Sequence, residues 1–114
     1  MKRIYTFGHE QVERNITVGD IIQNKNNNKK MTQVTAANQE EAEIIAKENI
    51  DMIITGSDWY EDVRKGAPNT FITAALFAGR FITNEEILRG AFDVMMAGAD
   101  SVLTLRRFDV VEMV

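Results

Sequence analysis

Residues 48–55 of this 114-residue sequence read ENIDMIIT, and residues 97–104 read AGADSVLT. Each stretch runs from a helix end through a turn residue, an apolar residue and an aspartate into a short apolar strand that ends in threonine. A short strand that is apolar throughout is typical of a parallel sheet covered on both faces. The repeat therefore predicts βα units whose parallel strands are joined by right-handed crossovers.

Further strands are predicted on either side of these stretches. Met31–Ala37 is rich in β-branched residues, and Thr70–Phe77 reads as another strand. The N-terminal segment 1–15 has a short strand-like start and then becomes polar. Residues 24–30 are predicted to form a solvated loop, because asparagine competes with helix formation by binding its own backbone.

Capping signals mark the helices between the strands. They predict a short helix over Gly19–Gln23, a second that ends near Glu48, a third that ends at Gly98, and the opening of a further helix over 108–114. The caps, capping-box partners and stop residues are Thr17, Asn38, Glu41, Asn49, Thr83, Glu86 and Gly98. The apolar stripe predicted for the third helix consists of Ile87, Ala91, Phe92, Met95 and Met96.

Composition limits the classes of function. With 13 Lys+Arg against 17 Asp+Glu the net charge is −4, which disfavours a nucleic-acid partner. The absence of cysteine removes disulfides, thiolate catalysis and cysteine-based zinc sites. The longest apolar runs are far shorter than the roughly 20 residues needed to cross a bilayer, and the first 15 residues lack the apolar region of a signal peptide. We therefore expect a cytoplasmic protein without a nucleic-acid or membrane partner.

Repeated βα units build either an open doubly wound sheet or a closed (β/α)8 barrel. No glycine-rich phosphate-binding motif follows a predicted strand, which lowers the weight of nucleotide-binding folds. The sequence blocks Lys30–Ala36 (KMTQVTA), Ile50–Asp58 (IDMIITGSD), Arg64–Phe71 (RKGAPNTF) and Ala97–Val102 (AGADSV) resemble the ketopantoate hydroxymethyltransferase (3-methyl-2-oxobutanoate hydroxymethyltransferase) family. This family belongs to the phosphoenolpyruvate/pyruvate-type barrels, and RKGAPN is the most specific of the matching blocks.

The resemblance implies a fold and a reaction. It implies that residues 31–114 form the N-terminal half of a (β/α)8 TIM-type barrel, preceded by an N-terminal extension and short helix over residues 1–30. It implies transfer of a hydroxymethyl group from methylenetetrahydrofolate to a 2-oxo acid in the pantothenate pathway, with Mg²⁺ polarising the oxo group. The family's catalytic base belongs to a later half that this sequence is not expected to contain. Four units are half a barrel, so we expect a homo-oligomer or contact with a missing C-terminal half.

The resemblance weakens where the family holds its metal and substrate. Ser57 stands in place of a metal-binding aspartate, with Asp58 one residue later as the substitute metal ligand. The family's other charged groups fall on Ala75, Leu103 and Leu105, which are apolar. The protein is therefore expected to be a diverged transferase, truncated or without catalysis.

Candidate site residues follow the predicted strands. Thr55, Ser57 and Arg106 are assigned to a 2-oxo acid, because hydroxyls and a guanidinium bind carboxylates. Asp58, Thr55 and Arg106 each have a structural alternative: Asp58 as an ordinary loop carboxylate, Thr55 as a common strand-end residue, and Arg106 as the exposed partner of a nearby carboxylate. The catalytic residues stay unassigned.

Three functions remain open from the sequence. The first is one-carbon transfer of the ketopantoate type. The second is a lyase or mutase of the phosphoenolpyruvate mutase–isocitrate lyase type, which uses the same enolate chemistry. The third is a non-catalytic binding or assembly module, which the apolar residues at Ala75, Leu103 and Leu105 favour.

Overall fold

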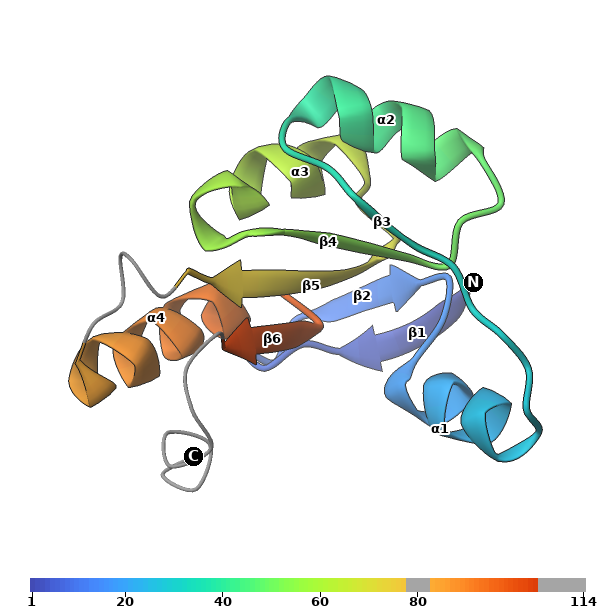
Figure 1. Cartoon of the computed structure of the whole chain (residues 1–114), viewed down its shortest axis with the longest axis horizontal. Coiled ribbons are helices and arrows are strands. Elements are labelled where there is room, and N and C mark those ends of the chain that lie inside the picture. Colours follow the sequence, from blue (N-terminus) through green and yellow to red (C-terminus); the bar gives the residue numbers. More distant parts are fainter. Residues whose placement is uncertain (78–82, 105–114) are drawn as a thin grey trace.

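The computed structural model describes residues 1–77 and 83–104 of the chain, which form a mixed α/β fold (Figure 1). The strands are β1 (Lys2–Tyr5), β2 (Gln11–Arg14), β3 (Gln33–Thr35), β4 (Met52–Gly56), β5 (Phe71–Leu76) and β6 (Ser101–Thr104). The helices are α1 (Val18–Asn26), α2 (Gln39–Lys47), α3 (Tyr60–Gly66) and α4 (Asn84–Met96), with a 3-10 turn η1 (Ser57–Trp59) before α3. Within these described ranges, no helix is long and apolar enough to cross a membrane.

The predicted parallel sheet is confirmed. Strands β3, β4, β5 and β6 form a four-stranded parallel sheet in which each strand pairs with the next along the chain. The register aligns Thr35 with Ile54, Ile54 with Thr73, and Thr73 with Ser101. Strands β1 and β2 form a separate antiparallel hairpin, of which the sequence predicted only the first strand.

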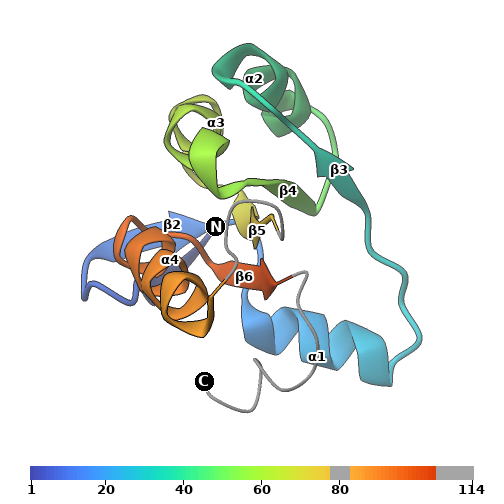
Figure 2. The same cartoon turned by 60° about the vertical axis from the view of Figure 1, so that its left-hand side comes forward.

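Helices α2, α3 and α4 cover one face of the curved sheet (Figure 2). Alternation along the strands sends Ile53, Ile72 and Ala74 to this helix-covered face, where they are fully buried. They pack in one apolar core with residues of the three helices, including Ala42, Val63 and Val94. We call the opposite side of the sheet its inner face; its strand positions include Gln33, Thr35, Ile54, Thr73, Ser101 and Leu103.

The predicted helix starts are confirmed by side-chain caps. The Thr17 and Thr83 hydroxyls each accept a hydrogen bond from the backbone N–H three residues later, and both form a complete capping box. The Asn38 side chain accepts from the Glu41 N–H at 2.9 Å. Gly98 follows α4 with a φ of 107°, a left-handed conformation that glycine adopts without a steric penalty.

Some predicted boundaries are wrong. Helix α1 continues to Asn26, into the predicted loop, and the strand predicted over Met31–Ala37 is limited to β3. Asn49 does not end α2 in a left-handed conformation, because the helix ends at Lys47 and the next residue, Glu48, is already extended. The helix predicted over 108–114 lies outside the described residues.

The predicted apolar stripe of α4 is also wrong in part. Ile87 is buried and Met95 packs against the core, but Phe92 and Met96 are about half exposed. Phe92 instead contacts Phe7 of the hairpin loop, with ring centroids 5.6 Å apart in an edge-to-face arrangement. The apolar surface of α4 therefore serves both the sheet and the hairpin, a long-range contact that helical periodicity does not reveal.

Candidate functional site

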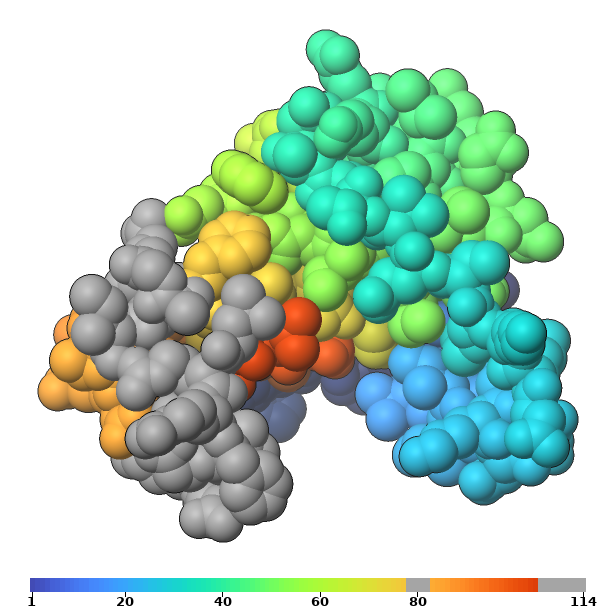
Figure 3. Space-filling view, in the orientation of Figure 1, coloured from blue at the N-terminus to red at the C-terminus, as the bar shows by residue number. Residues whose placement is uncertain are grey.

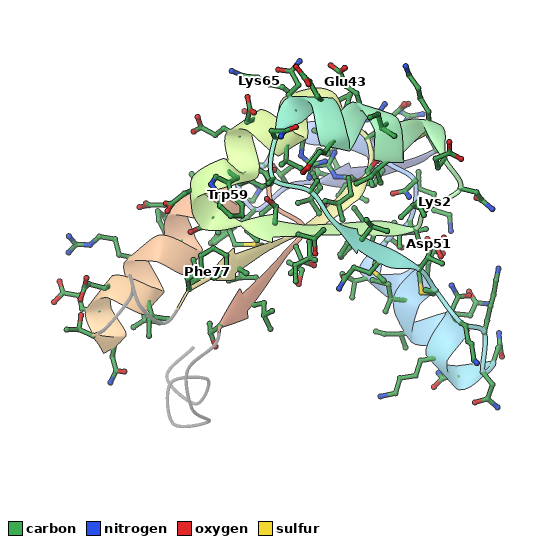
Figure 4. All side chains as sticks on the ribbon, turned by 45° about the horizontal axis from the view of Figure 1, so that its top comes forward. Lys2, Glu43, Asp51, Trp59, Lys65 and Phe77 are labelled. Atoms are coloured by element: carbon green, nitrogen blue, oxygen red, sulfur yellow. The ribbon has the colours of Figure 1, made fainter. Side chains whose placement is uncertain are left out.

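A pocket of about 190 Å³ lies at the carboxyl ends of the four parallel strands. Every strand of the sheet contributes to its wall, which consists of Thr35, Ile54, Thr55, Gly56, Trp59, Ala75, Phe77 and Leu103. Trp59 and Phe77 lie at this end of the sheet and Asp51 at the other (Figure 4). Because parallel strands end together at one edge, residues far apart in sequence converge here. We take this pocket as the candidate site.

Two aromatic rings cover the end of β4. Trp59 and Phe77 contact each other edge to face, with ring centroids 5.9 Å apart. Their contact depends on Gly56, because a Cβ at this position would lie 2.6 Å from Phe77 Cε2 and 3.3 Å from Trp59 Cε3. Any larger residue at Gly56 must displace the Phe77 ring, so this glycine sets the shape of the pocket.

Two hydroxyls at this end of β4 are buried without a hydrogen-bond partner. They belong to Thr55 and Ser57, and within the described part of the chain neither Oγ atom is paired. Thr55 is only 2% exposed, and its alternation along β4 places its side chain on the same side as Ile53. A buried polar group left unpaired costs about 1–3 kcal/mol. Such unpaired hydroxyls lower the stability of the fold.

The rest of the wall is apolar. Ala75 lies next to both Gly56 and Leu103 in the register of the sheet. The resemblance implies charged groups at Ala75 and Leu103, and the structure places these two apolar residues together in the pocket wall. The pocket therefore combines an apolar surface with the exposed hydroxyl of Thr35, a pairing suited to a small ligand with one alkyl and one polar end.

The predicted site residues are only partly brought together. Thr55 lines the pocket, and Ser57 follows it at the start of η1, half-buried. Asp58 lies on the same turn with its side chain exposed. Arg106, together with Leu105, falls outside the described residues, so its assignment stays a prediction.

The described residues do not fit the Mg²⁺ that the resemblance implies. Mg²⁺ is held by oxygen ligands, usually including one or two carboxylates. None of the residues lining the pocket is acidic, and nowhere in residues 1–77 and 83–104 do three His, Cys, Asp or Glu side chains cluster around a common point. The pocket is also too small to enclose methylenetetrahydrofolate, since sites for drug-sized ligands are roughly 300–1,000 Å³. The described residues therefore provide a fitting site for neither group.

A different polar cluster lies at the amino end of the sheet. Asp100, just before β6, accepts hydrogen bonds on both carboxylate oxygens from Arg14 Nε, at 2.8 and 2.9 Å. Arg64 Nη2 donates to the same carboxylate at 2.9 Å, and the Ile72 N–H donates to it at 3.0 Å. The Arg14 and Asp100 side chains are 2% and 5% exposed. We call Arg14, Arg64 and Asp100 the ion cluster.

The remaining guanidinium donors of the ion cluster are also satisfied. Arg14 donates to the carbonyls of Glu13, Pro68 and Gly98, and Arg64 donates to those of Ala67, Thr70 and Gly98. Arg64 Nε donates to the Tyr60 hydroxyl at 2.9 Å. Burial raises the pKa of Tyr60, which keeps this phenol protonated near neutral pH. These bonds join β2, α3, β5 and β6 into one structural unit.

The ion cluster gives a structural role to Asp100, one of the two aspartates of the sequence repeat. Asp100 and Asp51 occupy equivalent places before β6 and β4. Asp51 accepts from the Thr32 N–H at 2.9 Å, just as Asp100 accepts from the Ile72 N–H. Both aspartates thus hold the start of their strand to the preceding strand. The repeated aspartate is visible in the sequence but its two arginine partners are not, because Arg14 lies 86 residues away.

A second pocket, of about 320 Å³, lies at the amino end between the hairpin, the start of α1 and Phe71. Among the described residues on its wall, Asp100 is the one ionisable group apart from Tyr5, and both carboxylate oxygens are already bonded. Lys2 of β1 also bonds Asp20 of α1, and this hydrogen bond lowers the pKa of Asp20. The groups at this end bind one another, so we assign this pocket no ligand.

Comparisons with known proteins do not extend the assignment: no protein-family model matches the chain, and no curated protein matches it. The chemistry of the candidate site therefore rests on its own residues. These are the buried hydroxyls at the end of β4, the aromatic pair above Gly56 and the apolar wall formed with Ala75 and Leu103.

Proposed function

We propose that the chain supplies the substrate-binding half of a (β/α)8 barrel enzyme of the ketopantoate hydroxymethyltransferase type. In this proposal the pocket at the strand ends binds a small branched 2-oxo acid such as 2-oxoisovalerate. The observation that carries it is the convergence of all four parallel strands on one pocket at their carboxyl ends. Barrel enzymes bind their substrates at this end of the strands.

The two parts of the pocket suit the two parts of such a ligand. The branched alkyl group would lie against Ile54, Ala75 and Leu103, where it would leave water. The exposed hydroxyl of Thr35, on the inner face of the sheet, would donate to an oxo or carboxylate oxygen. An acceptor on the ligand keeps this hydroxyl paired when the ligand covers it, which favours a ligand carrying acceptors over a purely apolar one.

The described residues fit neither the metal nor the one-carbon donor of this reaction class, so the proposal assigns them to substrate binding. Within it, Thr35 orients the oxo acid, while the Trp59–Phe77 pair limits the access of water to it. The described residues are assigned no further catalytic role.

A second candidate function is a non-catalytic binding or assembly module. The observation that favours it is the apolar pair Ala75 and Leu103 at positions where the resemblance implies charge. Such a module would retain the sheet and its core without binding the oxo acid.

Calorimetric titration with 2-oxoisovalerate tests the proposal. The protein should bind this ligand more tightly than isovalerate, which lacks the oxo group, and the affinity should be the same with and without Mg²⁺. Gly56→Ala should weaken binding about tenfold or more, because the new Cβ would meet the Phe77 ring at 2.6 Å. The matched control is Gly19→Ala on α1, whose Cβ would lie 3.6 Å from Thr17 Oγ1, an ordinary contact.

Three results would count against it. Absence of binding to 2-oxoisovalerate by a folded protein would leave the non-catalytic module as the better function. Binding that requires Mg²⁺ would contradict the conclusion that the described residues do not fit the metal. Equal affinity in Gly56→Ala and Gly19→Ala would place the ligand elsewhere.

A further inference from the structure

The inner face of the sheet is exposed toward the carboxyl ends of its strands. On the helix-covered face Ile53, Ile72 and Ala74 are fully buried, whereas on the inner face Leu103 is 40% exposed. Thr35 is exposed as well, and Ile54, Thr73 and Ser101 are only partly buried. In the space-filling view, atoms of β6, in red-orange, are visible at the surface near the centre of the molecule (Figure 3). A parallel sheet is normally covered on both faces, so this face is unusual.

The strand positions that the structure describes on the inner face are uncharged. Its strand positions carry hydroxyl, amide and apolar side chains and no Asp, Glu, Lys or Arg. The exposed sides of the covering helices are rich in charge by comparison, with Glu40, Glu43, Glu61 and Lys65 all exposed. An uncharged, half-apolar surface of this kind is complementary to a copy of itself, since no like charges meet when two such faces approach.

The two edges of the sheet are also open in the described structure. Strand β3 pairs only with β4, and β6 pairs only with β5. Neither edge strand contains proline or a charged residue, the usual protections against pairing with another chain. Both edges therefore present backbone donors and acceptors to a further strand.

We propose that two copies of this chain close into one eight-stranded barrel, with their inner faces turned toward each other. A two-fold axis parallel to the strands places β6 of each copy beside β3 of the other, in parallel. The strand order β3-β4-β5-β6 then continues into the second copy. The same pairing of β6 with β3 occurs twice around the barrel. Eight strands give an interior just wide enough for side chains to fill it.

The area of the inner face shows that an interface between two copies must also include the strand edges. Four strands spaced about 4.8 Å apart and five residues long give a flat area of roughly 300 Å². A stable interface takes about 800 Å² from each partner, so the face alone is too small. The two strand edges, and the pairing that each makes, supply further contact area in the closed barrel. The closure also completes the wall of the candidate pocket, which the open sheet surrounds only on one side.

Light scattering after size-exclusion chromatography tests the assembly. The unaltered chain should have twice its 12.9 kDa monomer mass, about 26 kDa. Thr73→Lys places a charge in the middle of the inner face, outside the pocket wall, and should shift the mass to that of the monomer. Its matched control, Glu61→Lys on the helix-covered side, should remain a dimer. Circular dichroism of both variants shows whether each is folded.

Cross-linking tests the geometry, and the absence of natural cysteine makes it specific. Gln33→Cys labels β3 and Ser101→Cys labels β6, and a short bifunctional thiol reagent joins the two labels. A mixture of the two variants should give covalent dimers well above the level of either variant alone. A monomeric mass for the folded chain would overturn the assembly, and preferential cross-linking within Ser101→Cys alone would overturn the β6-to-β3 arrangement. Both readouts are independent of oxo-acid binding.

Discussion

The amino and carboxyl ends of the four-stranded sheet are built from different side chains. At the amino end Asp100 bonds two arginines and a backbone N–H, and each guanidinium is bonded again to carbonyls. At the carboxyl end the hydroxyls of Thr55 and Ser57 are buried without partners in the described structure. Polar groups are therefore fully paired at one end and left unpaired at the other.

This difference separates stability from function along one sheet. The ion cluster ties the hairpin, α3 and two strand starts together, so it resists local opening. The unpaired hydroxyls reduce stability next to the candidate pocket, and a local loss of stability is common at functional sites. Parallel βα folds place stabilising residues at the amino ends and functional residues at the carboxyl ends of their strands.

The largest expected effect is at the amino end. Asp100→Ala should lower the free energy of unfolding by about 3–5 kcal/mol, because it leaves two buried guanidinium groups without their counter-charge. Urea denaturation followed by circular dichroism measures this loss. The matched control is Asp51→Ala at the equivalent position of the repeat, which should cost only about 1 kcal/mol because, among the described residues, the Asp51 carboxylate accepts hydrogen bonds from Thr32 and carries no buried ion pair. Equal losses in the two variants would contradict the special role of the ion cluster.

A smaller effect of opposite sign is expected at the carboxyl end. Thr55→Val should stabilise the unliganded protein by about 1 kcal/mol, since it replaces an unpaired buried hydroxyl with a methyl group. The same substitution in a cap, Thr83→Val, should destabilise it by about 1 kcal/mol because the Glu86 N–H loses its acceptor. Thermal denaturation compares the two. A destabilised Thr55→Val would mean that the hydroxyl has a partner within the fold.

The smallest effect is a pH dependence at the edge of the ion cluster. Burial raises the pKa of Tyr60, so the unfolded chain loses the phenolic proton first as the pH rises above about 10. The contribution of Tyr60 to stability should therefore be constant below this pH and fall above it. Tyr60→Phe should reduce the slope of that fall relative to the unaltered chain. An unchanged slope would assign the alkaline loss to other groups.

The parts of the fold set by local signals could be predicted from the sequence. Thr17, Asn38 and Thr83 cap their helices as predicted, because a cap depends on residues only three positions apart. The two apolar strands of the repeat are β4 and β6, and each of them pairs in parallel with β5. Helix boundaries were harder to predict. Helix α1 continues through asparagines, although asparagine is unfavourable inside a helix.

Long-range features could not be predicted in the same way. The bond between Arg14 and Asp100 spans 86 residues, and neither residue has a local signal that marks it as buried. The strands of a parallel sheet are apolar on both sides, so their sequence does not distinguish Ile53 on the covered face from Ile54 on the inner face. The predicted site contained Thr55 and Ser57, but the contribution of Ala75 and Leu103 to a pocket became visible only from the register.

The most direct test of the division between the two ends is a residue-by-residue NMR titration with 2-oxoisovalerate. The amide resonances of Thr55, Gly56, Ala75 and Leu103 should shift as ligand is added, while those of Arg14, Ile72 and Asp100 stay in place. Shifts confined to the amino end, or spread equally over both ends, would contradict the account.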